Sequence, residues 1–142
     1  MKKLACVFAC AVALSACSNT QEPMGKSLQD LDGEWSVESV KGKNFKNAEQ
    51  VNKAFIGVRA QDKKLYGSAS CNRIISEISY DAKDGLNLGN VASTMMMCPD
   101  MDNERLFLEA LSEVKDYKIS GDKLYLVNGD NLLLVELSRI TN

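Results

Sequence analysis

The 142-residue sequence contains no histidine. Histidine is the commonest general base in enzymes and the commonest protein ligand for metals, so its absence excludes catalytic triads built on an imidazole. A zinc site without histidine would need three or four cysteine thiolates, and only two cysteines, Cys71 and Cys98, lie beyond the first 17 residues. Neither phosphate-binding glycine pattern, GxxxxGK[ST] or GxGxxG, occurs among the nine glycines. The sequence therefore predicts a protein that is not an enzyme, with no metal site and no cofactor.

Long apolar runs are also scarce, and the clearest one lies at residues 4–13. It is too short to span a bilayer permanently, which takes about 20 predominantly apolar residues. Lys2 and Lys3 precede it and Leu14-Ser15-Ala16-Cys17 follows it, which is the order of a secretory signal. The last four residues resemble a lipobox, in which the cysteine is acylated and the chain is cut just before it. We predict a lipoprotein signal peptide over residues 1–16 and lipid, including palmitate, on Cys17; an ordinary signal peptide with a chance cysteine is the alternative.

The segment after this cysteine is largely polar, which predicts a flexible, lipidated tether over residues 17–28 and one domain over residues 29–142. Two or more acyl chains would anchor the protein stably. Ser18 favours sorting to the outer membrane, so we expect a lipid-anchored protein of the cell envelope that faces the periplasm. Loss of residues 1–16 removes two of the 17 basic residues and none of the 19 acidic ones, which leaves a formal charge of −4. Such a domain is a poor partner for nucleic acid, and we expect it to be monomeric.

Five cysteines are present, but Cys6 and Cys10 belong to the predicted signal peptide. Once Cys17 is acylated, Cys71 and Cys98 remain for the domain. An isolated pair in an oxidising compartment suggests a disulfide, which for a loop of this length would stabilise the fold by about 3 to 4 kcal/mol. Two buried free thiols are the alternative, because spacing alone does not show that the sulfurs meet.

Short apolar runs separated by turn residues dominate the domain and predict β-strands. The period changes where Phe107, Leu111 and Val114 recur at helical spacing, so an amphipathic helix is expected near residues 100–115, with Asp100 as its cap. Another short helix is expected at residues 47–53. The fold class is therefore α+β, with about seven to eight short strands and one main helix. The expected strands are 35–40, 55–60, 65–70, 74–80, 86–91, 117–120, 123–127 and 131–137, of which the second and third form a hairpin and the last three a meander.

Soft metal ligands gather at Met95-Met96-Met97-Cys98, where thioethers and a thiolate could hold cuprous copper. Successive side chains of a strand point to opposite faces, however, so these thioethers would not converge. Packing in the core is the preferred interpretation of the methionines.

The carboxylates offer little evidence for hydrolysis or for calcium binding, because turn, cap and solvated-helix roles account for their positions. Those considered are Asp81, Asp84, Asp100, Asp102, Glu104 and Glu109.

The segments 67–73 (GSASCNR), 93–98 (STMMMC) and 104–111 follow one another in an order and spacing that resemble the META domain, the family that includes the HslJ-type bacterial lipoproteins. The resemblance extends from Leu31 to near Leu137. It implies a mostly antiparallel, curved sheet with the helix packed on it, and no catalysis. The sequence departs from the family in having Ile74-Ile75, where an aromatic residue is common. The residues that match the family motif are expected to be structural: Gly67, Cys71, Asn72, Thr94, Met97 and Cys98.

Three functional hypotheses follow. The first is a non-enzymatic envelope lipoprotein that binds a protein or peptide, attached to the membrane through acylated Cys17; a role in envelope maintenance or stress tolerance is what the resemblance implies. The second is a carrier or scavenger of a lipid, a hydrophobic antibiotic or a copper ion. The third, with the least support, is a carboxylate-based hydrolase.

Overall fold

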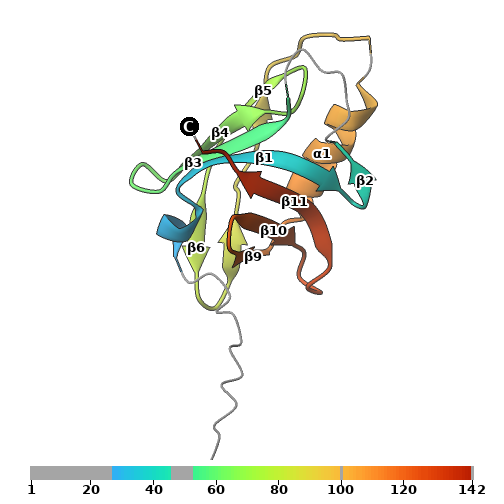
Figure 1. Cartoon of the computed structure of the whole chain (residues 1–142). Helices are drawn as coiled ribbons and strands as arrows, with labels where there is room; N and C mark the ends of the chain where they lie inside the picture. The colour runs from blue at the N-terminus through green and yellow to red at the C-terminus, as the bar shows by residue number, and fades with distance from the viewer. Residues whose placement is uncertain (1–26, 46–52, 100, 142) are drawn as a thin grey trace, which may run out of the picture.

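The computed structural model describes residues 27–45, 53–99 and 101–141 (Figure 1). Its strands form one nine-stranded sheet in the order β8-β5-β4-β3-β1-β11-β10-β9, with β2 paired to β1 alone, and a separate hairpin of β6 and β7. All pairings are antiparallel. The elements are η1 (Leu28–Leu31), β1 (Gly33–Val40), β2 (Lys43–Asn44), β3 (Phe55–Arg59), β4 (Lys64–Ser68), β5 (Arg73–Glu77), β6 (Ser79–Asp81), β7 (Gly85–Asn87), β8 (Ala92–Ser93), α1 (Asp102–Glu113), β9 (Asp116–Ser120), β10 (Lys123–Val127) and β11 (Leu133–Arg139).

The core lies between the sheet and α1, which packs against β1 and β11 (Figure 1). Trp35 of β1, Phe107 of α1 and Tyr117 of β9 are fully buried there. Burial of one such apolar side chain stabilises a fold by about 1.5 to 3 kcal/mol. The indole N–H of Trp35 donates to the backbone oxygen of Leu31 at 2.8 Å, so its polar group also has a partner. The predicted helix face, with Phe107 and Leu111, is therefore the face that meets the sheet.

The hairpin of β6 and β7 connects two distant parts of the main sheet. The amide of Ile78, just before β6, donates to the backbone oxygen of Lys63 in the turn between β3 and β4, at 3.0 Å. The amide of Leu86 in β7 donates to the backbone oxygen of Lys115, next to β9, at 2.7 Å. These bonds bring the β4 side and the β9 side of the curved sheet together, although the edge strands β8 and β9 do not pair with each other.

The predicted α+β class, the β3–β4 hairpin and the β9–β10–β11 meander are confirmed. The expected single strand at 74–80 is wrong: the β4–β5 ladder ends at the in-register bond from the Ile78 amide to the backbone oxygen of Lys63, and Ser79–Asp81 then pairs with β7 as the separate strand β6. The expected strand at 86–91 ends at Asn87, whose side-chain oxygen accepts a hydrogen bond from the amide of Gly89 at 2.8 Å and turns the chain. The two-residue strands β2 and β8 were not expected. Asp100 and residues 47–52 of the predicted short helix lie outside the described residues.

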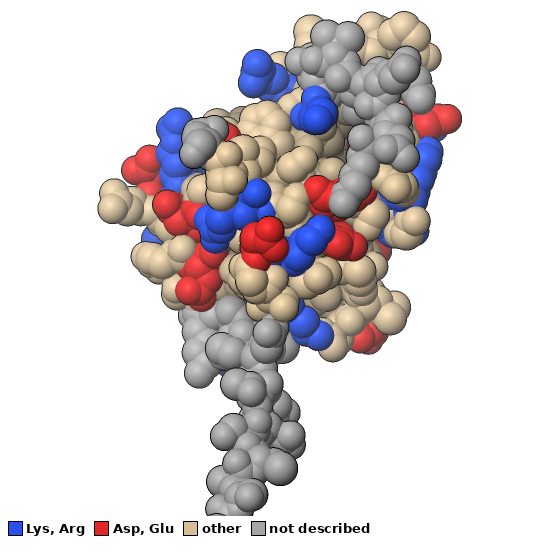
Figure 2. Space-filling model, in the orientation of Figure 1, with Lys and Arg blue, Asp and Glu red and all other residues tan. Residues whose placement is uncertain are grey.

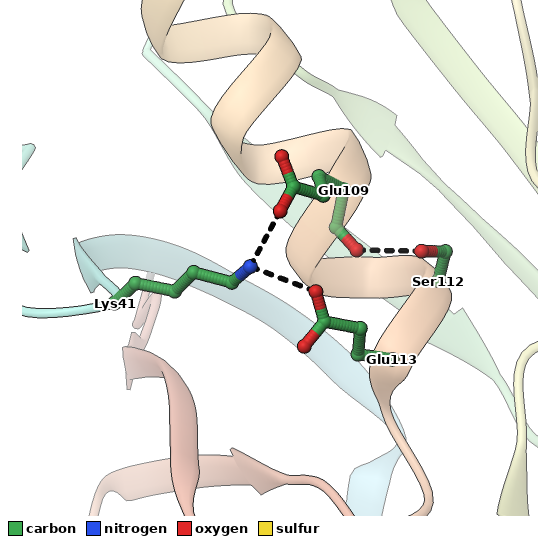
Figure 3. A network of polar contacts seen from close by, with 4 residues as sticks. All are labelled: Lys41, Glu109, Ser112 and Glu113. Atoms are coloured by element: carbon green, nitrogen blue, oxygen red, sulfur yellow. Dashed lines mark hydrogen bonds and ion pairs between the residues drawn. The ribbon is translucent and has the colours of Figure 1, made fainter.

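Lys41 joins the end of β1 to the C-terminal half of α1 (Figure 3). Its Nζ lies 2.8 Å from Oε1 of Glu109 and 2.7 Å from Oε1 of Glu113, which are one helical turn apart on the same face of α1. These hydrogen bonds, to Glu109 first and then to Glu113, raise the pKa of Lys41 above its usual value. The group is largely exposed to water, so these ion pairs contribute little to the stability of the domain.

Tyr117 fixes the point at which the chain enters the domain. Its hydroxyl donates to the backbone oxygen of Ser27 at 2.6 Å and accepts from the Ser27 amide at 3.2 Å, and it lies 3.2 Å from Oδ2 of Asp30. Burial first, and then the charge of Asp30, raise the pKa of Tyr117 well above its usual value. No helix within the described ranges is long and apolar enough to cross a membrane.

Alkaline pH should therefore destabilise the domain through Tyr117. An unfolded tyrosine loses its proton near pH 10, whereas the folded Tyr117 retains it, so stability is complete below about pH 10 and falls as the pH rises further. Urea unfolding midpoints measured from about pH 8 to about pH 11 should fall more steeply for the natural chain than for Tyr117→Phe. The variant starts lower because it lacks the bonds to Ser27. Parallel curves would contradict this account.

Candidate functional site

A buried carboxylate connects α1 to the loop between β4 and β5. Glu104, in the first turn of α1, is 3% exposed. Its Oε2 accepts hydrogen bonds from the amides of Cys71 at 3.0 Å and Asn72 at 2.7 Å, and its Oε1 accepts from Nδ2 of Asn72 at 2.6 Å. A buried carboxylate is tolerated when such bonds replace its hydration. The prediction that Glu104 lies on a solvated helix face is therefore wrong.

Asn72 is the centre of this network, and all four hydrogen bonds that its side-chain amide can make are formed. Nδ2 donates to Glu104 and, at 3.1 Å, to the backbone oxygen of Met96. Oδ1 accepts from the hydroxyl of Thr94 at 2.8 Å and from the amide of Met96 at 2.7 Å. The side chain is 2% exposed, so none of these bonds competes strongly with water.

Cys71 and Cys98 form a disulfide with their Cα atoms 6.1 Å apart. The bond attaches the far end of residues 94–98, which we call the methionine arm, to the same loop that Asn72 and Glu104 hold. The near end is attached through the Thr94 amide, which donates to the backbone oxygen of Arg73 at 3.0 Å. The arm is thus held at positions 94, 96 and 98.

The methionines of the arm are exposed, and the prediction that they pack in the core is wrong. Met95 is 94% exposed, Met97 89% and Met96 54%. The strand assumed in that prediction ends at Ser93, and the arm that follows is irregular. The Met95 and Met97 side chains extend into solvent, whereas the backbone of Met96 is bonded to Asn72 through both its N–H and its C=O. The side chains of Thr94 and Cys98 and the backbone of Met96 are built into the fold, whereas the methionine side chains are not.

Gly67 also has a structural place, in β4 beside β3. A Cβ at this position would lie 2.1 Å from the backbone oxygen of Phe55, so no larger residue fits without a shift of the strand. The close approach occurs where β3 and β4 curve together. This placement fits the expectation that Gly67 is structural.

A shallow apolar groove of about 440 Å³ runs beside the arm on the outer face of β4, β5 and β8. Ile75, 56% exposed, lies opposite small Ala92 of β8 and beside Tyr66 of β4. Arg73 lines one end, and within the described ranges its guanidinium has no ion-pair partner. The guanidinium of Arg59 lies 5.0 Å from the centre of the Tyr66 ring. The groove therefore combines apolar side chains with the positive charge of Arg73, while the hydroxyl of Tyr66 donates to the carboxylate of Glu34 at 3.0 Å.

Comparisons with known proteins identify the fold and the family. The model of the META domain matches residues 26–139. The chain belongs to the META domain family. No curated protein matches the sequence.

Two solved structures resemble this META domain. The NMR structure of a protein from Burkholderia xenovorans has a TM-score of 0.66 and 17% identity, with all of both chains covered. The crystal structure of a DUF4847 family protein from Bacteroides vulgatus has a TM-score of 0.54 and 17% identity over 79% of this chain and 95% of that one. At this identity they show a shared fold.

The structure brings four of the residues that match the META motif into one cluster: Cys71, Asn72, Thr94 and Cys98. The side chain of Met97 is outside that cluster, and Gly67 lies further along β4. Glu104 was not recognised as part of the site, although a signal was present. It precedes Phe107 and Leu111 by three and seven residues, so it shares the buried helix face, where a carboxylate needs partners. Cys17 lies outside the described residues and its acylation stays a prediction.

Replacing Glu104 by alanine should destabilise the META domain strongly. The change leaves three buried N–H groups without an acceptor, so the free energy of unfolding should fall by about 3 kcal/mol or more. Urea unfolding measures it, with Glu109→Ala as the control, because Glu109 makes only an exposed ion pair on the same helix. Similar small losses for both variants would show that the Glu104 carboxylate does not hold the loop.

Removal of the disulfide should also destabilise the domain. Cys71 and Cys98 are 27 residues apart, and in the chain-entropy model a loop of this size contributes about 3 to 4 kcal/mol. The double variant Cys71→Ser/Cys98→Ser should show this loss in urea unfolding under non-reducing conditions. An unfolding curve unchanged from that of the natural chain would contradict the prediction.

Proposed function

We propose that this META domain protein is a non-enzymatic, lipid-anchored component of the cell envelope that binds an extended segment of another protein at the β8 edge. The observation that carries the proposal is an exposed sheet edge beside an apolar groove, both held by a buried network. Sheet edges of this kind bind extended peptides by adding a strand, with main-chain bonds for affinity and side-chain pockets for specificity.

The hydrogen-bond pattern of β8 supports strand addition. Thr94 bonds to Arg73, and in an antiparallel ladder such bonded pairs alternate with unbonded ones. Ser93, opposite Ile74, is therefore in an unbonded pair, and its N–H and C=O point away from β5. An added strand would pair with these groups. An apolar side chain from it would then pass over Ala92 and reach Ile75.

The charge around the groove indicates the chemistry of the partner. Arg73 lines the apolar groove and has no ion-pair partner among the described residues, whereas acidic and basic side chains are interspersed over much of the face in Figure 2. The expected segment is therefore extended, apolar at alternate positions, and carries an acidic residue that reaches Arg73. A rigid edge favours such binding because the domain loses little conformational entropy when the partner binds.

The position of the groove suits a tethered protein. The chain enters the domain through η1, at the lower left of Figure 1, whereas the methionine arm, which follows β8, lies at the top of that view. With lipid on Cys17 and a flexible tether, the groove would lie at the end of the domain away from its attachment point, open to proteins within reach of the linker.

The two other hypotheses have less support from the geometry. A lipid or antibiotic would have to use the shallow outer groove, because Trp35, Phe107 and Tyr117 fill the inner face of the sheet. A hydrolase would need a carboxylate free to exchange protons with substrate, and Glu104 is instead engaged by three N–H donors.

Site-specific photo-cross-linking in intact cells tests the proposal. A photoreactive residue at position 75 should capture one protein repeatedly, whereas the same residue at position 132 should not, because Leu132 is equally exposed, at 62%, but lies on the β10–β11 turn. The cross-linked segment, made as a synthetic peptide, should bind the purified domain. Ile75→Asp and Ser93→Pro should each weaken that binding by about tenfold or more, and Leu132→Asp should leave it unchanged.

Two results would reject the proposal. One is cross-linking that is absent at position 75 or identical at position 132. The other is a captured segment whose binding tolerates Ser93→Pro, because proline removes the outward N–H that strand addition requires.

A further inference from the structure

The thioethers of Met95 and Met97 are displayed in a way that packing does not explain. Both side chains are almost fully exposed, at 94% and 89%. A large apolar side chain contributes nothing to the core when it stays in water, and several of them together mark a surface with another use. The arm that carries them is held firmly, with Met96 bonded to Asn72 through both its N–H and its C=O.

The short separation of these two residues allows their sulfurs to reach one ion. Residues two apart in an extended segment are about 6.6 Å apart, and neither side chain is engaged by the core. Each methionine has three rotatable side-chain bonds, so the two sulfur atoms can approach a common point between them. Met96 is 54% exposed and lies between them, where a turn of its side chain would add a third thioether.

The surrounding chemistry selects the kind of ion. Cys98 is bonded to Cys71 and supplies no thiolate, and the sequence has no histidine. No group of three histidine, cysteine or acidic residues that could hold a metal occurs in the part of the chain that the structure describes. Neutral, soft thioethers bind cuprous ions and related soft monovalent cations, and they are poor ligands for magnesium, calcium or zinc.

We propose that Met95 and Met97, assisted by Met96, form a surface binding site for a soft monovalent cation, cuprous copper in the cell. The backbone of the arm is fixed by the Asn72 network and the disulfide, so only rotations of the methionine side chains are needed to bring the ligands together. This site is independent of strand addition at β8, because it uses sulfur chemistry and not the apolar character of the arm.

Silver(I) is the probe for the test, because it is a soft monovalent ion that does not change oxidation state under the conditions used. The purified chain without residues 1–16, which removes Cys6 and Cys10, and with Cys17→Ser, which removes the remaining thiol outside the disulfide, is titrated with silver nitrate in nitrate buffer without thiol reductants. Binding is followed by calorimetry and by NMR of chain labelled at the methionine methyl groups. We expect one silver ion per chain and shifts of the Met95 and Met97 methyl signals, while that of the half-buried Met101 stays in place.

Leucine substitutions separate the thioethers from the apolar surface. Met95→Leu and Met97→Leu should each weaken silver binding by about tenfold or more, and the double variant should abolish it. Met101→Leu is the matched control and should bind as the natural chain does. The variants at Met95 and Met97 should unfold at the same urea concentration as the natural chain, since these exposed side chains make no core contacts.

Three outcomes would overturn the site. They are the absence of silver binding by the natural chain, equal binding by the Met95→Leu/Met97→Leu variant, and binding that appears only after reduction of the disulfide, which would show a thiolate site. The same variants keep the apolar arm and the β8 edge, so peptide binding should persist in them. Failure of one proposal is thereby distinguishable from failure of the other.

Discussion

The buried carboxylate of Glu104 is the constraint on which the rest of this META domain depends. It has to be satisfied by hydrogen bonds, and three N–H groups of Cys71 and Asn72 satisfy it. Because Glu104 begins α1 and the other two residues connect β4 to β5, these bonds join the helix to the half of the sheet that it does not cover. Asn72 then uses its remaining bonding capacity on Thr94 and Met96. One buried charge thus determines where the loop and the methionine arm lie.

The consequence is a surface that is apolar, exposed and ordered at the same time. Exposed methionines are usually mobile, but here every second residue of the arm is held, by Arg73, by Asn72 and by the disulfide to Cys71. The Met95 and Met97 side chains therefore stay in water without letting the arm fold onto the core. The edge of β8 and the groove at Ile75 lie beside them. Both proposed functions depend on this ordered surface. Strand addition would use the backbone edge of β8, and soft-cation binding would use the sulfur atoms of Met95 and Met97.

Sequence periodicity was enough to predict most of the fold. The apolar residues of the strands, and Phe107 and Leu111 of the helix, recur at the spacing of their own element, so the buried face of each element can be recognised from neighbouring residues alone. Periodicity failed at residues 74–91, where the chain passes from the β4–β5 ladder into the β6–β7 hairpin and a local bond from Gly89 to Asn87 ends the second strand. The hairpin bonds Lys115 through Leu86, and that contact depends on a part of the chain far away. The motif residues were found as a group through family resemblance. Their partner Glu104 was missed because helical charge was assumed to be solvated, and the methionines were misplaced because hydrophobicity alone was taken to mean burial.

The most direct test of the central claim is amide hydrogen exchange along the arm, measured by NMR on the oxidised chain. The Thr94 and Met96 amides donate to Arg73 and Asn72, so they should exchange slowly although the arm lies at the surface. The Met95 and Met97 amides, which point away from the network, should exchange rapidly. In Asn72→Ala the protection of Met96 should disappear. Rapid exchange at all four positions in the natural chain would show that the arm is free, and would contradict the account.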